Sequence, residues 1–141
     1  MAVLVECVAG KTFKELISPA ICETISANDL QLMENAMSKS TDVWMVSDSG
    51  QMVGITGVAP DSLLAREAFI WNYTNPFNNR VSVGVMRATR QVVDHFLNQY
   101  PTLVGYCELP NAKAQRWVRW LGAEFGQLNG QLIPFMIKAK T

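Results

Sequence analysis

The chain has 141 residues, of which 49% are hydrophobic and 17% charged, a composition typical of one globular domain and not of a disordered protein. Twelve Lys and Arg residues balance twelve Asp and Glu residues, which disfavours a nucleic-acid-binding module, since such modules usually carry a basic excess. No apolar run reaches membrane-spanning length, and His95 as the only histidine excludes a histidine-rich metal site.

The three cysteines are an odd number and form no C-x-x-C pair. Cys7, Cys22 and Cys107 therefore predict reduced thiols in a cytoplasmic setting rather than a disulfide framework. Residues 1–10 contain Glu6 and lack a basic segment, so we expect no signal peptide. A Cys–His nucleophile is not expected, because His95 falls on the polar side of its predicted helix.

The first half of the chain predicts a strand, two helical segments and three further strands. Ser26 is a candidate N-cap, with Asp29 in the first turn of the helix that follows. Gly50 lies between two β-rich runs and predicts a hairpin turn. The near-continuous apolar run Ala68–Trp71 predicts a central strand covered on both faces. The expected segments are a strand at 3–8, a helical segment at 11–26 that Ser18-Pro19 interrupts, a helix that begins at 27 and ends in 38–41, hairpin strands at 43–46 and 52–58, and a strand at 65–74.

The second half predicts a long amphipathic helix from Val81, a strand at 102–109, another helix and a closing hairpin. Arg90 and Asp94 face away from the apolar stripe and are spaced for an i,i+4 ion pair. Gly122 is a candidate C-cap for the second helix, and Asn129-Gly130 predicts the final turn. The expected order is β-α-α-β-β-β-α-β-α-β-β in one domain, residues 1–141. The predicted apolar stripe of the second helix consists of Ala114, Trp117, Val118 and Leu121.

The segment "NAKAQRWVRWLGAEF" resembles the Asn-x-x-Ala-x-x-aromatic/Leu-Tyr-x-x-x-Gly-Phe helix of the GNAT acetyltransferases. The residues that match are Asn111, Ala114, Leu121 and Gly122, and "VWMVSDSGQMVGITGV" is similar to the second and third strands of that family. The resemblance implies a mixed α/β fold, with a mostly antiparallel central sheet and helices on both faces.

The resemblance also implies an acetyl-CoA loop of pattern Arg/Gln-x-x-Gly-x-Gly/Ala at the start of the long helix. The corresponding stretch here is Arg80, Val81, Ser82, Val83, Gly84 and Val85. Valines at both small-residue positions place β-branched side chains where phosphate oxygens approach the backbone. The helix N-terminus keeps its dipole, so weak anion binding remains open. The sequence therefore predicts no tightly bound coenzyme A and no cofactor.

The tyrosine that often serves as the general acid of the family aligns with Val118, which has no proton to give. Glu67 and Glu108 flank the implied site, and each is a candidate base, but strand glutamates are more often solvated. The sequence therefore assigns no catalytic residue.

Residues 100–140 are similar to the C-terminal half of GNAT-like internal virion proteins of short-tailed bacteriophages. This resemblance implies a virion component, present in the host cytoplasm during assembly, with other virion proteins or copies of itself as partners. Trp120 and Phe77, with Arg116 and Arg119 beside Trp120, are the candidate interface residues. The leading hypothesis is an inactive acetyltransferase-like assembly protein. The alternative is an active acetyl-CoA-dependent N-acetyltransferase.

Overall fold

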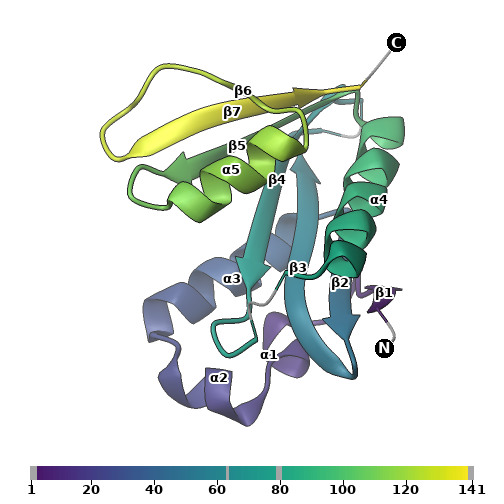
Figure 1. Ribbon diagram of the computed structural model, residues 1–141, viewed down its shortest axis with the longest axis vertical. Coiled ribbons are helices and arrows are strands. Elements are labelled where there is room, and N and C mark those ends of the chain that lie inside the picture. The colour runs from purple at the N-terminus through teal and green to yellow at the C-terminus, as the bar shows by residue number, and fades with distance from the viewer. Residues whose placement is uncertain (1–2, 63, 79–80, 140–141) are drawn as a thin grey trace.

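The computed structural model describes residues 3–62, 64–78 and 81–139 of the protein. Its centre is a seven-stranded sheet in the order β1-β2-β3-β4-β5-β7-β6. Neighbouring strands are antiparallel except β4 and β5, which run parallel. Helices cover both faces of the sheet (Figure 1). The predicted mixed α/β class, with a mostly antiparallel sheet between helices, is confirmed.

The sequence predicted that Ser18 and Pro19 interrupt the first helical segment, and in the structure they divide it into two helices, one more than the predicted order has. The hydroxyl of Ser18 caps the second piece by accepting a hydrogen bond from the N–H of Ile21, and Pro19 occupies its first turn. The elements are β1 (Val3–Cys7), α1 (Phe13–Leu16), α2 (Pro19–Thr24), α3 (Ala27–Lys39), β2 (Asp42–Asp48), β3 (Gln51–Pro60), β4 (Glu67–Thr74), α4 (Val83–Gln99), β5 (Thr102–Glu108), α5 (Ala112–Trp120), β6 (Glu124–Phe125) and β7 (Leu132–Lys138).

Local sequence signals account for several element ends. Ser26 caps α3 as predicted, since its hydroxyl accepts a hydrogen bond from the N–H of Asp29 at 3.0 Å. Ser49 and Gly50 have φ values of 55° and 83°, so the β2–β3 hairpin closes with two left-handed residues. Gly122 has φ of 96° just after the end of α5, the expected place for a helix-terminating glycine.

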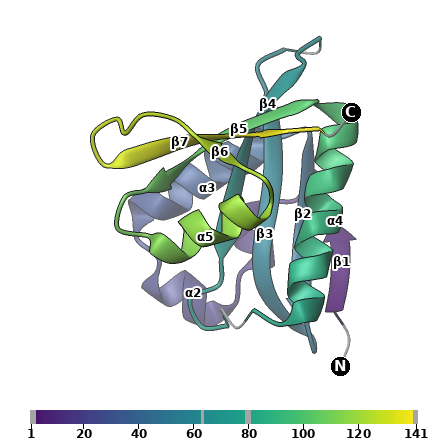
Figure 2. The same cartoon turned by 45° about the horizontal axis from the view of Figure 1, so that its top comes forward.

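Each face of the sheet has its own core. α4 and α5 cover one face, and α1 to α3 cover the other, as Figures 1 and 2 show from two directions. Both cores consist of large apolar side chains that alternate along the strands. The first contains Val58, Ala68, Ile70, Val92, Val93, Phe96, Leu103, Cys107, Leu121, Phe135 and Ile137; the second contains Val8, Phe13, Met37, Val43, Ile55 and Trp71.

Three predictions of detail are corrected. β4 is central, but Phe69 is 39% exposed, so the strand is not covered on both faces along its whole length. The long helix begins at Val83, and Val81 precedes it. The closing hairpin is mostly loop, because β6 has two residues and Asn129 joins β7 only through an isolated bridge to Leu132.

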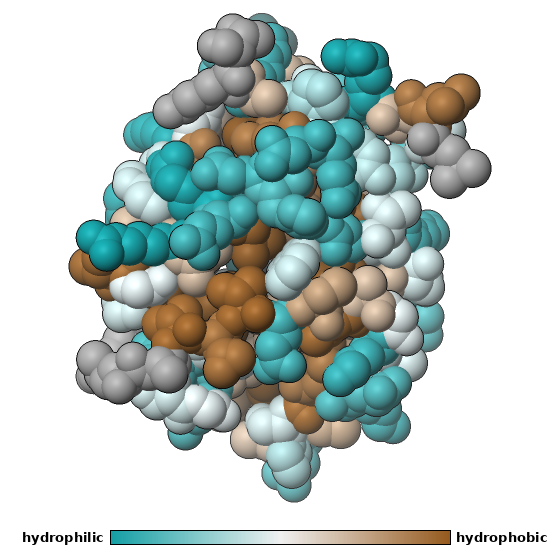
Figure 3. Space-filling model, turned by 90° about the vertical axis from the view of Figure 1, so that its right-hand side faces the viewer, coloured by the Kyte–Doolittle hydropathy of each residue, from teal (hydrophilic) through white to brown (hydrophobic). Residues whose placement is uncertain are grey.

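The outer surfaces are mixed in character. On the face that carries α4 and β1, hydrophilic side chains form a broad band across the upper half and many hydrophobic ones gather below it (Figure 3). Among the described residues, no helix is both long and apolar enough to cross a membrane.

Candidate functional site

β4 and β5 separate shortly after they meet. Their parallel pairing extends only from Glu67 opposite Thr102 to Phe69 opposite Val104. β4 then continues to Thr74 and β5 to Glu108 with no pairing between them. The two strands diverge across the middle of the molecule (Figures 1 and 2). The sheet is therefore split at its centre.

Gly105 lies where the strands begin to part. A Cβ atom there would lie 2.6 Å from the Phe135 ring and 3.0 Å from the carbonyl oxygen of Ile70. Contacts this short leave room only for hydrogen, so β5 can approach both β4 and the Phe135 ring only with glycine at this position. The apex of the split is tightly packed, and the opening lies beyond it.

The edges of both strands direct backbone groups into the opening. In an antiparallel pair, alternate residues hydrogen-bond to the partner strand and the others point the opposite way. Asn75 donates to the carbonyl of Val53 at 2.9 Å, so on β4 it is Asn72 and Thr74 whose N–H and C=O groups face β5. Leu109 donates to the carbonyl of Gln131 at 2.7 Å, so on β5 the N–H and C=O groups of Tyr106 face β4. Glu108 faces β4 with its N–H group alone, because its carbonyl accepts a hydrogen bond from the N–H of Asn111 at 3.0 Å.

A cleft of about 570 Å³ occupies this opening. Its size is within the range of about 300–1,000 Å³ that small-molecule sites usually have. Side chains from β3, β4, β5, α4 and α5 all contribute to its wall. The lining includes Thr56, Phe69, Asn72, Tyr73, Val81, Val85, Thr89, Tyr106, Cys107, Glu108, Lys113, Trp117 and Val118.

The N-terminus of α4 lies at this cleft. The hydroxyl of Ser82 accepts a hydrogen bond from the N–H of Val85 at 3.1 Å, which leaves the N–H groups of Val83 and Gly84 without an intrahelical partner. Val83 is 65% exposed and does not line the cleft, whereas Val85 is buried in the core and Val81 lines the cleft wall. Arg80 of the predicted loop lies outside the described residues.

The two candidate bases occupy different places. Glu67 is exposed at the start of β4 and is absent from the cleft lining, whereas Glu108, at the end of β5, lines it. Val118 lines the cleft as well, so no phenol is supplied from the α5 position where the GNAT pattern has tyrosine. Tyr73 and Tyr106 supply phenols from the strands instead. The sequence analysis did not single out these tyrosines, and the alternating pattern of the strands was the only available signal.

Cys107 lines the cleft as a thiol rather than a thiolate. Its side chain is buried, and this burial raises the pKa of the thiol. His95 lies elsewhere: its Nε2 atom is 2.8 Å from Oδ2 of the buried Asp42. The expectation that these two residues form no Cys–His pair agrees with this placement.

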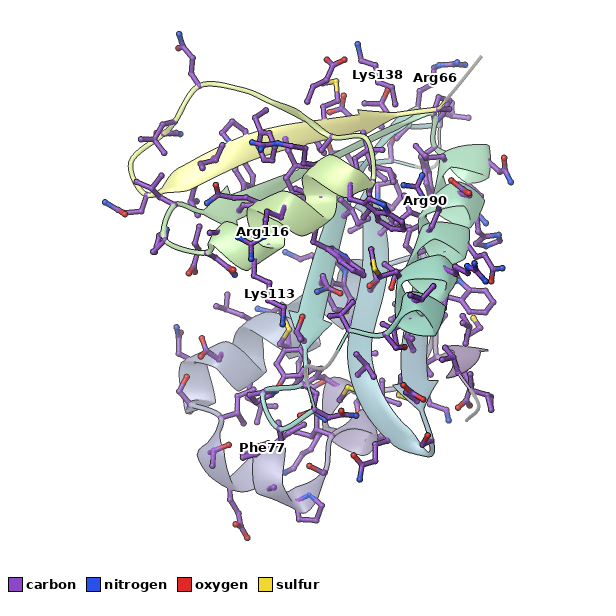
Figure 4. All side chains as sticks on the ribbon, viewed as in Figure 1. Arg66, Phe77, Arg90, Lys113, Arg116 and Lys138 are labelled. Carbon is purple, nitrogen blue, oxygen red and sulfur yellow. The ribbon has the colours of Figure 1, made fainter. Side chains whose placement is uncertain are left out.

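The four candidate interface residues do not form one surface. Trp120 is 40% exposed, but Arg90 stacks on its ring at 4.1 Å and donates to its carbonyl oxygen at 2.6 Å. This contact replaces the predicted Arg90–Asp94 pair, and Arg90 points from α4 toward α5 in Figure 4. Arg119 lies over the Phe125 ring at 5.3 Å, while Arg116 and Phe77 are exposed on separate elements. Their role in assembly stays a prediction.

No protein-family model matches the chain, and no curated protein matches it by sequence. Solved structures do match. The N-acetyltransferase PseH of Campylobacter jejuni, in complex with acetyl coenzyme A, aligns with 99% of this chain and 100% of its own at a TM-score of 0.66 and 13% identity. A Bacillus subtilis acetyltransferase in complex with CoA aligns with 99% and 100% at a TM-score of 0.72 and 6% identity.

The GNAT domain of PAT from S. lividans aligns with 96% of this chain and 89% of its own at a TM-score of 0.66 and 11% identity. The chain therefore has the GNAT acetyltransferase fold, as the resemblance in the C-terminal half implied. At these identities the likeness shows the fold alone.

Proposed function

We propose that the protein is an acetyl-CoA-dependent N-acetyltransferase, which transfers an acetyl group to an amine in the β4–β5 cleft. The observation that carries the proposal is the split in the sheet, where backbone groups of both strands face a cleft of about 570 Å³. The fold, shared with acetyltransferases solved with CoA or acetyl-CoA, supports the same conclusion.

The residues present fit this ligand. Acetyl-CoA supplies an acetyl thioester at the end of a thin chain that contains amides. Backbone groups of Asn72, Thr74 and Tyr106, and the N–H group of Glu108, can pair with those amides as sheet edges pair with an added strand. The free N–H groups of Val83 and Gly84 and the dipole of α4 favour a phosphate at the mouth of the cleft.

The transfer itself needs a positioned amine, stabilisation of charge and one proton donor. The amine nitrogen forms a bond to the acetyl carbon, the carbon–sulfur bond breaks, and the thiolate leaves. The amine gives up a proton, for which Glu108 in the cleft lining is the acceptor that we assign, and the thiolate gains one. N–H groups of β4 that face the cleft stabilise negative charge on the acetyl oxygen. We assign Tyr106 as the proton donor to the leaving thiolate, because its side chain lines the cleft and is exposed.

A thermal melt with and without millimolar acetyl-CoA tests the binding step. Ligand at about 100 times its dissociation constant adds about 2.7 kcal/mol, which raises the melting temperature of a domain this size by several degrees. Release of free thiol with a panel of amines then tests transfer, and Tyr106→Phe should lower kcat while leaving the melting shift intact. A chain that shows no shift with acetyl-CoA contradicts the proposal.

The virion role is the second candidate. It is supported by the C-terminal resemblance and by the exposed aromatic residues Phe77 and Trp120. The solved structures described above are acetyltransferases, which favours the enzyme. Trp120→Asp should abolish co-elution with an assembly partner on size exclusion if the assembly role holds. Unchanged co-elution of this variant would remove Trp120 from the interface.

A further inference from the structure

A second cavity lies on the opposite side of β4, against α2 and α3. Its volume is also about 570 Å³. Asn72, Tyr73 and Thr74 line both this cavity and the β4–β5 cleft, so the two meet along the end of β4. Its other lining residues are Ile21, Thr24, Ile25, Asp29, Leu32, Met33, Pro76 and Phe77.

The lining of this second cavity is mostly apolar with one negative charge. Two isoleucines, a leucine, a methionine and a phenylalanine supply the apolar surface. Asp29 is the only charged side chain among the described residues of the lining. Phe77 is 58% exposed at the rim, and Figure 4 shows it beside α2. A carboxylate and aromatic rings both attract an ammonium group, and the apolar surface favours a hydrophobic body attached to it.

We propose that this cavity binds the acceptor of the acetyl group, and that the acceptor is a molecule with one ammonium group attached to an apolar or aromatic part. The inference rests on the proposed function for its catalytic part, because it places the acceptor nitrogen where the two cavities meet, at residues 72–74, next to the thioester. A hydrophilic amino sugar or a polyamine fits the cavity less well. A polyamine carries several charges for one carboxylate, and an amino sugar leaves its hydroxyl groups against apolar walls.

Asp29 has a structural role that must be separated from this one. It lies in the first turn of α3, where a carboxylate favours the helix dipole. That role alone predicts a small loss of stability for Asp29→Asn and no change in amine affinity. A binding role predicts weaker binding of cationic amines, with no effect on neutral ligands of the same shape.

Tyr73 fits the same cavity as a hydrogen-bond donor. Its ring packs edge-on against the buried Phe13 ring at 4.9 Å, which holds it in place. Burial, and secondly the charge of Asp29, raise the pKa of its phenol. The phenol therefore keeps its proton at neutral pH and can orient the acceptor, but it does not serve as the base.

The test begins with binding in the absence of acetyl-CoA. Phenethylamine is titrated into the full chain and followed by NMR, with 2-phenylethanol as the neutral probe of the same shape. We expect phenethylamine to shift the signals of Tyr73 and Met33, and Asp29→Asn to weaken its affinity about fivefold without affecting phenylethanol. Asp94→Asn removes the same charge from an exposed position on α4 and should change neither affinity.

A second variant tests the cavity at an exposed residue, so that the conclusion does not depend on Asp29→Asn alone, which could affect folding. Phe77→Ala truncates an exposed side chain and should weaken phenethylamine about tenfold while leaving a small amine such as ethylamine unchanged. Turnover with acetyl-CoA then compares phenethylamine with a short peptide that has an N-terminal leucine. The better substrate decides whether the ammonium comes from a free amine or from a chain terminus.

The outcomes separate the two proposals. If phenethylamine binds and responds to Asp29→Asn while acetyl-CoA does not bind, the amine site stands and the acetyltransferase function fails. If acetyl-CoA binds but apolar amines neither bind nor react, the proposal that the cleft binds acetyl-CoA stands and this inference is overturned. Preferred turnover of glucosamine or spermidine would overturn it as well.

Discussion

The guanidinium of Arg90 lies 4.1 Å from the centre of the Trp120 ring, and its Nη2 atom donates to the Trp120 carbonyl oxygen at 2.6 Å. The ring of Trp117 also lies near it, with the two ring centroids 5.8 Å apart. No residue within α5 itself is fully buried, and Leu121 just after it is. The Arg90–Trp120 contact therefore has a large share in fixing α5 to α4 beside the cleft.

Arg90→Ala should lower the free energy of unfolding by about 1–2 kcal/mol, because it removes a cation–π contact and a charged hydrogen bond that are both partly exposed. Urea unfolding gives the value. Arg87→Ala, on an exposed part of the same helix, is the matched control and should stay within about 0.5 kcal/mol of the parent. Equal losses in the two variants would show that the contact adds no stability.

Local patterns predicted most elements because each signal lies within a few residues of its effect. The Ser26 cap, the Gly50 turn and the glycine after α5 are of this kind. The exposure of Phe69 was not predictable, because it depends on where β5 separates from β4, and the two strands are far apart in the sequence. The Arg90–Trp120 contact was missed for the same reason, since an i,i+4 partner is visible in a sequence and one 30 residues away is not.

Gly105→Ala should destabilise the protein by about 1–3 kcal/mol, the usual cost of inserting a methyl group into a packed core. The new Cβ would meet the Phe135 ring at 2.6 Å and the backbone oxygen of Ile70 at 3.0 Å. Thermal unfolding measures the loss. Gly126→Ala is the control for the change of residue type, because Gly126 has no positive φ and its new Cβ would approach no atom more closely than Cγ of Pro134, at 3.2 Å. A Gly105→Ala variant as stable as the parent would mean that β4 and β5 can part further.

Cys107 should react with iodoacetamide far more slowly at pH 8 than the exposed Cys7 and Cys22, because burial raises the pKa of its thiol and shields it. Mass spectrometry of the alkylated tryptic peptides gives the order in which the three cysteines react. The same shift makes stability depend on pH. The folded thiol holds its proton above the ordinary pKa of 9.0, where the unfolded thiol loses it, so stability is complete below about pH 9 and falls above it.

The control for this pH effect is Cys107→Ala, which should show a smaller fall in unfolding free energy between pH 8 and about pH 10 than the parent. Rapid alkylation of Cys107 at pH 8, at the rate of the other two cysteines, would place its thiol in solvent and contradict its burial.

Residue types alone did not reveal the candidate site, since much of it consists of backbone groups. The N–H groups of Asn72, Thr74, Tyr106 and Glu108 face the cleft whatever side chains these residues carry. Their position depends on strand register, and register depends on distant partners. The acetyl-CoA loop was located by its motif, and the sequence analysis placed the steric obstacle at Val83 and Val85. In the structure Val81 and Val85 line the cleft, and Val83 does not.

Val81→Gly should strengthen acetyl-CoA binding about fivefold, because it removes a β-branched side chain from the cleft wall beside the N-terminus of α4. Calorimetric titration with acetyl-CoA measures the affinity. Val83→Gly is the comparison: it keeps the N–H group that we assign to the phosphate and removes only a side chain that is 65% exposed and does not line the cleft, so we expect no gain in affinity. A gain confined to Val83→Gly would show that the loop binds phosphate in the arrangement of the GNAT motif, with Val83 as the obstacle.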